Sequence, residues 1–170
     1  MEDIRTLDGV RAEIEEIHRS VRDDLDRAGA IRFNPTAWVW IQRKPETGER
    51  LDTPARMKVV TPFGAPLDVL VAAVRKVAMA HGAVGVCLMV PLYLVDELPL
   101  DGSSLPPPGP DDMRLAFTVE HMSERIGRPL WTAKVVQQGH SVEIGDLEEK
   151  EGGAIPLGSI GSLLPQREMN

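Results

Sequence analysis

The chain has 170 residues, a formal charge of −7 and a pI near 5.1, so it is long enough for one domain with its own hydrophobic core. An acidic chain repels polyphosphate backbones, which argues against nucleic acid as a partner. A single cysteine, Cys87, excludes an intramolecular disulfide, and the first residues carry neither a basic nor an apolar leader segment. We therefore expect a cytoplasmic protein, and the longest apolar run, residues 83–95, is too short to cross a membrane as a helix.

The first predicted element is an amphipathic helix over residues 4–28, whose start is expected nearer Asp8 than Asp3 because Gly9 weakens the first turn. Its apolar residues recur every three or four positions, at Ile4, Leu7, Val10, Ile14, Ile17, Val21, Leu25 and Ala28. This stripe predicts a helix that packs across a sheet, with His18 on the charged side of the helix. Because the spacing is nearly heptad, a second hypothesis stays open, in which Leu7, Ile14 and Val21 bind a partner or a second copy.

A β-hairpin is predicted next, from a strand over residues 36–43 and a short strand over residues 56–60. Trp38 and Trp40 lie two residues apart and therefore share one face of the first strand. Burial against the N-terminal helix is the favoured interpretation. The alternative is an exposed pair of indoles that binds a partner.

Residues 66–95 are the most hydrophobic part of the chain and predict a helix over residues 66–81 followed by a long strand over residues 83–95. Pro66 suits the first helical position, and Gly82 suits the end of the helix. Both faces of the strand are apolar, which predicts packed layers on each side. The helix is expected to cover one face. The other face needs the N-terminal helix, the C-terminal tail or a second copy, and the last option predicts a homo-oligomer.

The segment over residues 99–112 is rich in proline and predicts an exposed loop. A second hairpin is predicted beyond it, from strands over residues 113–121 and 130–137, with Glu120 on the solvent side. A short extended piece over residues 141–144 follows, and the acidic residues 146–151 are expected in solvent.

The last twenty residues change abruptly to glycine, serine and isolated aliphatic side chains. We therefore predict one α+β domain over residues 1–150 and an extended tail over residues 151–170, which either stays disordered or docks in a groove. Its run Gly-Ser-Ile-Gly-Ser-Leu at positions 158–163 loosely resembles the loading tails that attach cargo proteins to encapsulin shells. The tail residues predicted to bind a partner are Ile155, Leu157, Ile160 and Leu163.

No linear motif for a nucleophile, a metal site or a nucleotide loop is present in the sequence, so we predict neither metal nor cofactor. The weak catalytic candidates are His121 with Glu120, and Cys87 with His81. Neighbouring residues on a strand point to opposite faces, which argues against His121 and Glu120 acting together. Cys87 lies in a predicted buried strand, where a thiol behaves as a small hydrophobe.

Together these elements predict an α+β fold with a mixed, mostly antiparallel sheet of four to six strands and two packed helices. The favoured function is a non-catalytic, self-associating protein-binding or assembly module that uses its N-terminal helix, its tail or both. The expected partner is the protein itself or another protein, with no membrane and no nucleic acid. The alternative is a small cofactor-independent enzyme with a pocket near His121 and Trp131.

Overall fold

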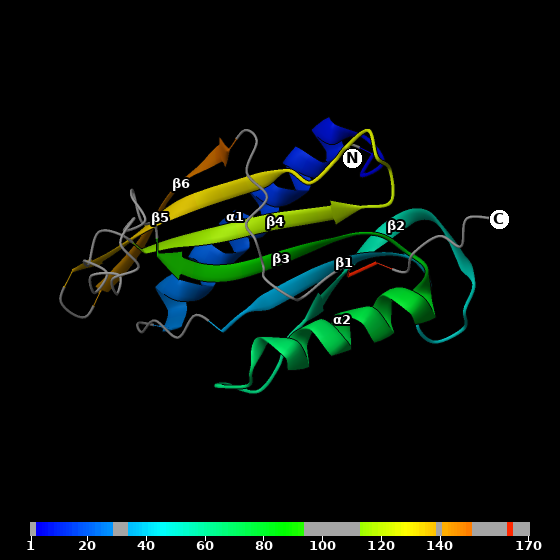
Figure 1. Cartoon of the computed structure of the whole chain (residues 1–170), viewed down its shortest axis with the longest axis horizontal. Helices are drawn as coiled ribbons and strands as arrows, with labels where there is room; N and C mark the ends of the chain where they lie inside the picture. The colour runs from blue at the N-terminus through cyan, green and yellow to red at the C-terminus, as the bar shows by residue number, and fades with distance from the viewer. Residues whose placement is uncertain (1–2, 29–33, 94–112, 139–140, 151–162, 165–170) are drawn as a thin grey trace, which may run out of the picture.

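In the computed structural model, residues 3–28, 34–93, 113–138, 141–150 and 163–164 are described, and they form two helices and a six-stranded sheet (Figure 1). The elements in chain order are α1 (Leu7–Ala28), β1 (Thr36–Arg43), β2 (Arg50–Val59), α2 (Leu67–His81), β3 (Ala83–Tyr93), β4 (Met113–His121), β5 (Leu130–Gln138) and β6 (Ser141–Lys150). The strand order is β2-β1-β3-β4-β5-β6, and every neighbouring pair is antiparallel. The predicted α+β class is confirmed, with a sheet that is antiparallel throughout its described strands.

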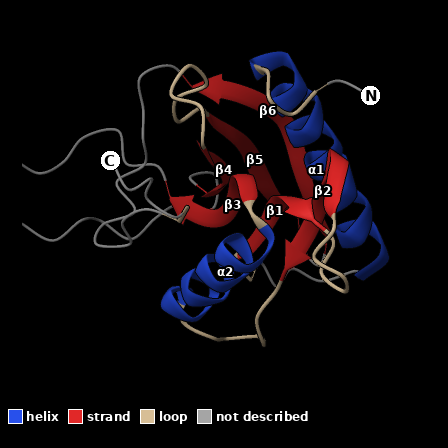
Figure 2. Cartoon of the chain, turned by 90° about the vertical axis from the view of Figure 1, so that its right-hand side faces the viewer, coloured by secondary structure: helices blue, strands red, loops and turns tan. Residues whose placement is uncertain are grey.

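The sheet is curled, and each of its two faces carries one helix (Figure 2). Helix α1 lies along the concave face, and α2 packs on the opposite face over β1 and its neighbours. Between α1 and the sheet, Trp38 and Trp40 are 5% and 1% exposed, which confirms that the indoles pack against the N-terminal helix. The same layer buries Val10, Ile14, Ile17, Val21, Cys87, Met89, Leu115, Phe117, Val119, Trp131, Ala133, Val135 and Ile144.

The second layer of the core lies between α2 and the sheet. It buries Leu70, Val71, Val74 and Ala78 of the helix against Ala37, Val39, Ile41, Val86, Leu88 and Val90 of β1 and β3. Strand β3 is therefore covered on both faces, as its double apolar pattern predicts. The N-terminal helix is the second cover. An uncovered face of β3, which was the argument for a homo-oligomer, is not found among the described residues.

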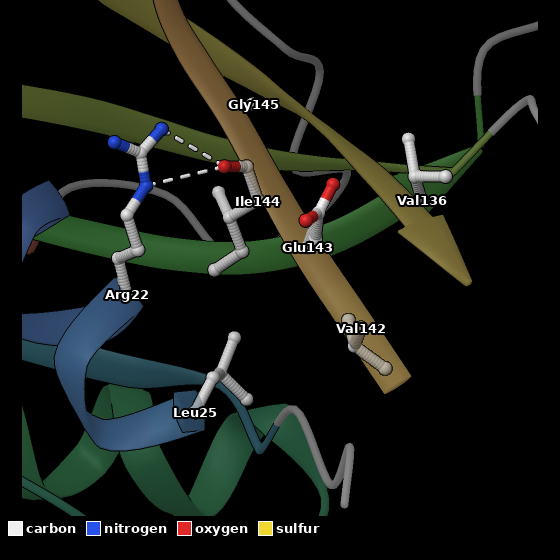
Figure 3. Close-up of a pocket in the computed structure, with 7 residues that line it drawn as sticks. All are labelled: Arg22, Leu25, Val136, Val142, Glu143, Ile144 and Gly145. Atoms are coloured by element: carbon white, nitrogen blue, oxygen red, sulfur yellow. Dashed lines mark hydrogen bonds between the residues drawn. The ribbon is translucent and has the colours of Figure 1, made fainter. Parts of the chain in front are cut away.

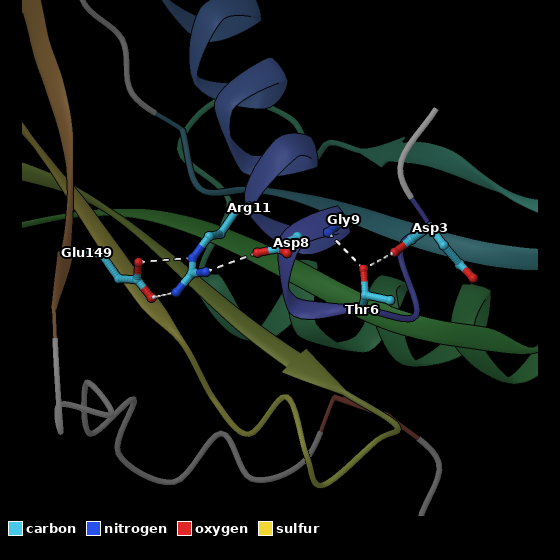
Figure 4. Close-up of polar contacts among 6 residues, drawn as sticks. All are labelled: Asp3, Thr6, Asp8, Gly9, Arg11 and Glu149. Atoms are coloured by element: carbon cyan, nitrogen blue, oxygen red, sulfur yellow. Dashed lines mark hydrogen bonds and ion pairs between the residues drawn. The ribbon is translucent and has the colours of Figure 1, made fainter.

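Helix α1 begins at Leu7, close to the expected start near Asp8, and the residues before it form a cap (Figure 4). The Gly9 N–H donates to Thr6 Oγ1 over 3.0 Å, and the Thr6 hydroxyl donates to the Asp3 carbonyl over 2.8 Å. This carbonyl lies directly over Gly9, where a Cβ would be 1.8 Å from its oxygen. Glycine, which weakens most helices, is therefore required here.

Helix α2 has the predicted ends, apart from a shift of one residue at its start. Pro66 is the N-cap, in an extended conformation, and Leu67 is the first helical residue. Gly82 takes the left-handed conformation at φ 65°, and its N–H donates to the Ala78 carbonyl. The glycine thus turns the chain directly from α2 into β3.

Both edge strands are longer than predicted. Strand β2 spans ten residues instead of the short strand at 56–60. Strand β6 likewise continues through residues 146–150, which were expected in a solvated acidic segment. An edge strand pairs on one side only and tolerates charges and proline, so its sequence lacks the apolar pattern of an inner strand.

Several predicted segments lie outside the described residues. They are the proline-rich loop at 99–112, residues 94–95 of the long strand, and most of the tail, including Ile155, Leu157 and Ile160. Among the helices that the structure describes, neither has the length and apolar content needed to span a membrane.

Candidate functional site

The tail dipeptide Leu163-Leu164 is buried on the α2 side of the sheet, with the two residues 4% and 6% exposed. The Leu163 N–H donates to Glu120 Oε2 over 2.8 Å, and the Leu164 N–H donates to Glu120 Oε1 over 3.3 Å. One carboxylate on β4 therefore accepts two consecutive backbone donors. We call Glu120 and the buried aliphatic cluster that contains the two leucines, which includes Val86, Leu88, Ala116 and Leu130, the tail seat.

Glu120 lies in the tail seat because of the alternation along β4. It shares the α2 side with Ala116, which is fully buried, and it pairs across the sheet with Val86, which is also fully buried. Glu120 was predicted to face solvent and is instead half-buried, because this face of the sheet carries a second core layer. A carboxylate in such surroundings requires hydrogen-bond donors, and the backbone of the tail supplies two.

His121 points to the opposite face of β4, as alternation predicts, and both of its ring nitrogens are hydrogen-bonded. The Ser123 N–H donates to Nδ1 over 2.9 Å, so Nδ1 carries no proton. Nε2–H then donates to the Ile4 carbonyl over 3.1 Å. Burial lowers the pKa of His121, opposed by the hydrogen bond to Ile4. The imidazole is therefore a neutral link between β4 and the N-terminal segment, without a nitrogen free to act as a base.

An open hollow of about 740 Å³ lies beside His121. Its lining residues are Arg5, Gln42, Val84, His121, Met122, Ser123, Glu124 and Arg125. Trp131, which was predicted to share a pocket with His121, does not line this hollow and is 5% exposed in the α1 layer. The hollow brings a partly buried neutral imidazole together with surface charges.

The remaining catalytic candidates lie apart from this hollow. Cys87 is completely buried in β3, and burial raises the pKa of its thiol, whereas reactive thiols need an exposed, electropositive setting. His81 is the last residue of α2 and half-buried. Within the described ranges, no three His, Cys, Asp or Glu side chains gather in a group able to hold a metal ion.

His18 is a buried polar residue whose position the sequence did not indicate. It is 7% exposed, its Nε2–H donates to the Gly145 carbonyl over 2.8 Å, and its ring meets Phe117 edge-on at 6.3 Å. Burial lowers the pKa of His18. Its predicted place on a charged, solvated helix side is wrong, because the curled sheet brings β6 against that side of α1.

Charged residues of α1 fasten this helix to β6. Arg22 donates from Nε and Nη2 to the Ile144 carbonyl, over 3.2 and 2.9 Å (Figure 3). These residues border a hollow of about 380 Å³ between the end of α1 and strands β5 and β6. Near the start of the helix, Arg11 forms a pair of 3.2 Å contacts with Glu149 (Figure 4). Arg22, which lines the hollow, and Arg11, which lies outside it, thus both hold α1 to β6.

The other edge of the sheet is fastened to α1 through Glu13. Its Oε2 accepts hydrogen bonds from Arg56 Nη1 over 2.6 Å and from the Trp40 indole over 3.1 Å. Arg56 also donates to Glu16 over 3.1 Å. Side chains of α1 therefore bond to both edge strands.

The predicted partner-binding residues fall into two groups. Ile14, Val21, Trp38 and Trp40 are buried beneath α1, and Leu7 packs half-buried beside them. A partner could reach these side chains only if α1 left the sheet. Leu163 occupies the tail seat, so the tail remains the candidate contact element of the folded chain.

The described surface also carries large apolar side chains along α2 and the segment before it. Met79 is 74% exposed, Phe63 68%, Val60 62% and Val69 47%.

Comparisons of the chain with protein-family models, with curated proteins and with solved structures gave no match. The tail seat and the exposed apolar side chains along α2 are therefore the features of the described surface that bear on function.

Proposed function

We propose that this protein is a non-catalytic binding and assembly module whose C-terminal tail contacts other proteins. The observation that carries the proposal is the docked dipeptide Leu163-Leu164, held by two hydrogen bonds to Glu120. Leucines that bury their side chains on one folded surface have the chemistry to do so on another. The hydrogen bonds of His121 and the burial of Cys87 favour this proposal over the enzyme alternative.

The first partner class to test follows from the sequence of the tail. Residues 158–163 resemble encapsulin loading tails, and this resemblance supports an assembly in which the tail attaches the domain to a larger protein shell. A cytoplasmic location fits this proposal, since the single cysteine is free and buried.

The test attaches residues 151–170 to a fluorescent reporter that is expressed together with an encapsulin shell protein. We expect the reporter to co-purify with the shell, and Leu163→Ser to reduce the co-purified fraction. Met169→Ser, outside the resembling run, is the matched control. A reporter that stays outside the shell, or enters it equally with and without Leu163→Ser, would contradict this partner class.

Self-association is the second part of the proposal, and the outer side of α2 supports it. Val69 and Met79 are exposed there on either side of the small, exposed residue Ala72. Asp68 lies at the N-terminal end of the helix and Lys76 near the C-terminal end. Two copies of α2 packed antiparallel about a two-fold axis would set Asp68 of each copy near Lys76 of the other.

Sedimentation velocity over a range of protein concentrations tests this arrangement. We expect a dimer that dissociates on dilution, and Val69→Asp with Met79→Asp should shift the chain to monomer. Asp68→Lys alone should weaken the dimer, whereas Asp68→Lys with Lys76→Asp should restore it. A wild-type chain that remains monomeric at high concentration would exclude self-association through α2.

A further inference from the structure

We infer that the tail seat is a peptide-binding site that keeps the chain's own tail docked, so that docking and partner binding by the tail exclude each other. This inference rests on the proposed function of the tail. It concerns a regulatory contact within the folded chain, made between β4 and residues 43 and 44 positions further along the chain.

Docking and partner binding exclude each other because the docked dipeptide has no side chain or backbone N–H left for a partner. Both leucine side chains are buried in the aliphatic cluster, and both backbone N–H groups donate to Glu120. Leu163 is also the last residue of the run that resembles a loading tail. A partner groove that buries Leu163 must therefore first take it from the tail seat.

The chemistry of the site defines the ligand it accepts. It takes two consecutive aliphatic residues whose neighbouring N–H groups point at one carboxylate. Position 165 is proline, which has no N–H, so the chain offers donors at 163 and 164 and none at the next residue. A glutamine at position 120 would present one acceptor oxygen and an NH₂ group, which cannot accept from the second donor.

Docking within one chain is favoured over docking of a separate peptide. A tethered segment acts at an effective concentration in roughly the millimolar range. A contact that is weak between separate molecules therefore keeps the tail docked most of the time. The apparent affinity of any tail-binding partner is therefore its intrinsic affinity multiplied by the fraction of chains whose tail is undocked.

The test empties the seat in the full-length chain and offers the tail as a labelled peptide of residues 158–167. Fluorescence anisotropy should detect binding to Leu163→Ser/Leu164→Ser, whose own tail no longer competes. We expect wild type to bind about tenfold more weakly, because its own tail occupies the site. Adding Glu120→Gln to the emptied chain should also weaken binding about tenfold, the effect of losing a charge-assisted hydrogen bond. Glu46→Gln, an exposed charge in the β1–β2 turn, is the matched control and should change nothing.

A second measurement covers the case in which the emptied chain folds poorly. Amide hydrogen exchange at Leu163 and Leu164 should speed up about tenfold in Glu120→Gln relative to wild type, while exchange in β3 stays unchanged. The inference is overturned if the emptied chain does not bind the peptide, if Glu120→Gln leaves both measurements unchanged, or if wild type binds the peptide equally well. Neither measurement includes a partner protein. A reporter that fails to co-purify with the shell would therefore refute the proposed partner class without contradicting the inference about the tail seat.

Discussion

Two histidines act as neutral structural links in this protein. His18 joins α1 to β6 through the Gly145 carbonyl, and His121 joins β4 to the segment before α1 through the Ile4 carbonyl. Protonating His121 would place a proton on Nδ1, where it would face the Ser123 N–H. The hydrogen bonds of His121 thus require its ring to remain uncharged, whereas burial is the main effect that disfavours the charged form of His18.

Stability should fall as the pH drops below the ordinary histidine pKa of about 6.5. The pKa values of His18 and His121 are lowered in the folded state, so the unfolded chain binds protons in this range more readily. Their contribution is complete above that pH and is lost as the pH falls towards the folded pKa values. Urea unfolding at several pH values checks this.

His18→Gln and His121→Gln should each flatten that pH profile. His81→Gln is the control, because the His81 ring makes no hydrogen bond within the part of the chain that the structure describes. A wild-type profile that stays flat between neutral and mildly acidic pH would show that the two rings do not resist protonation.

Gly85 is a residue where side-chain packing requires the absence of a Cβ. A Cβ built there would lie 3.1 Å from the Trp40 ring and 3.1 Å from the His121 ring, both from neighbouring strands. We expect Gly85→Ala to reduce the free energy of unfolding by about 1–3 kcal/mol, the usual cost of overpacking. Gly145→Ala, another strand glycine with ordinary 3.5 Å contacts, is the matched control in urea titrations. Equal effects at the two positions would contradict this packing argument.

At the scale of elements, α1 is held to the sheet by apolar burial beneath it and by polar contacts at both edges. The contact to β2 is the more enclosed one, since Arg56 and Glu13 have side chains 26% and 17% exposed. The contact to β6 through Arg11 and Glu149 is 42% and 41% exposed. Enclosed charges depend more on their partners than exposed ones.

Arg56→Met should therefore destabilise the protein by about 1–2 kcal/mol, because Glu13 keeps its charge but loses its cation. Arg11→Met should have the smaller effect of the two. Adding Glu13→Gln to Arg56→Met should recover part of the loss, which a double-mutant cycle in urea would measure. Equal losses for Arg56→Met and Arg11→Met would mean that burial does not distinguish the two contacts.

The inner elements could be predicted from the sequence, whereas the edge strands were predicted only in part and their full length could not be. The apolar periodicities of α1, α2 and β3 reflect burial on defined faces, and the structure confirms them. Strands β2 and β6 carry charges and a proline, so their patterns do not differ from those of loops. His18 and Glu120 were misplaced for a related reason, because their partners lie 127 and 43 residues away and local spacing contains no information about them.

At the scale of the whole molecule, both edges of the sheet carry features that discourage pairing with another sheet. Strand β2 has Pro54 within it, and the acidic residues of β6 include Glu143 and Glu148. Charges and proline on edges oppose edge-to-edge aggregation. Self-association is therefore better sought on the helical face than through the strands.

Replacing Glu143 and Glu148 with threonine should make the chain prone to aggregation. Threonine suits a strand and removes the edge charges, so light scattering during storage at high concentration should increase. Glu46→Thr with Glu124→Thr removes the same charge from exposed turns and is the control. Similar light scattering from both double variants would mean that the aggregation comes from the loss of net charge and not from the loss of charges on the edge strand.

The three tryptophans of this chain, Trp38, Trp40 and Trp131, all belong to the layer beneath α1. The tryptophan fluorescence of the protein is therefore confined to one side of the sheet. It will report the detachment of α1, while events on the α2 side, including release of the tail, proceed without an indole beside them. An optical signal for the tail thus requires a fluorophore introduced on that side.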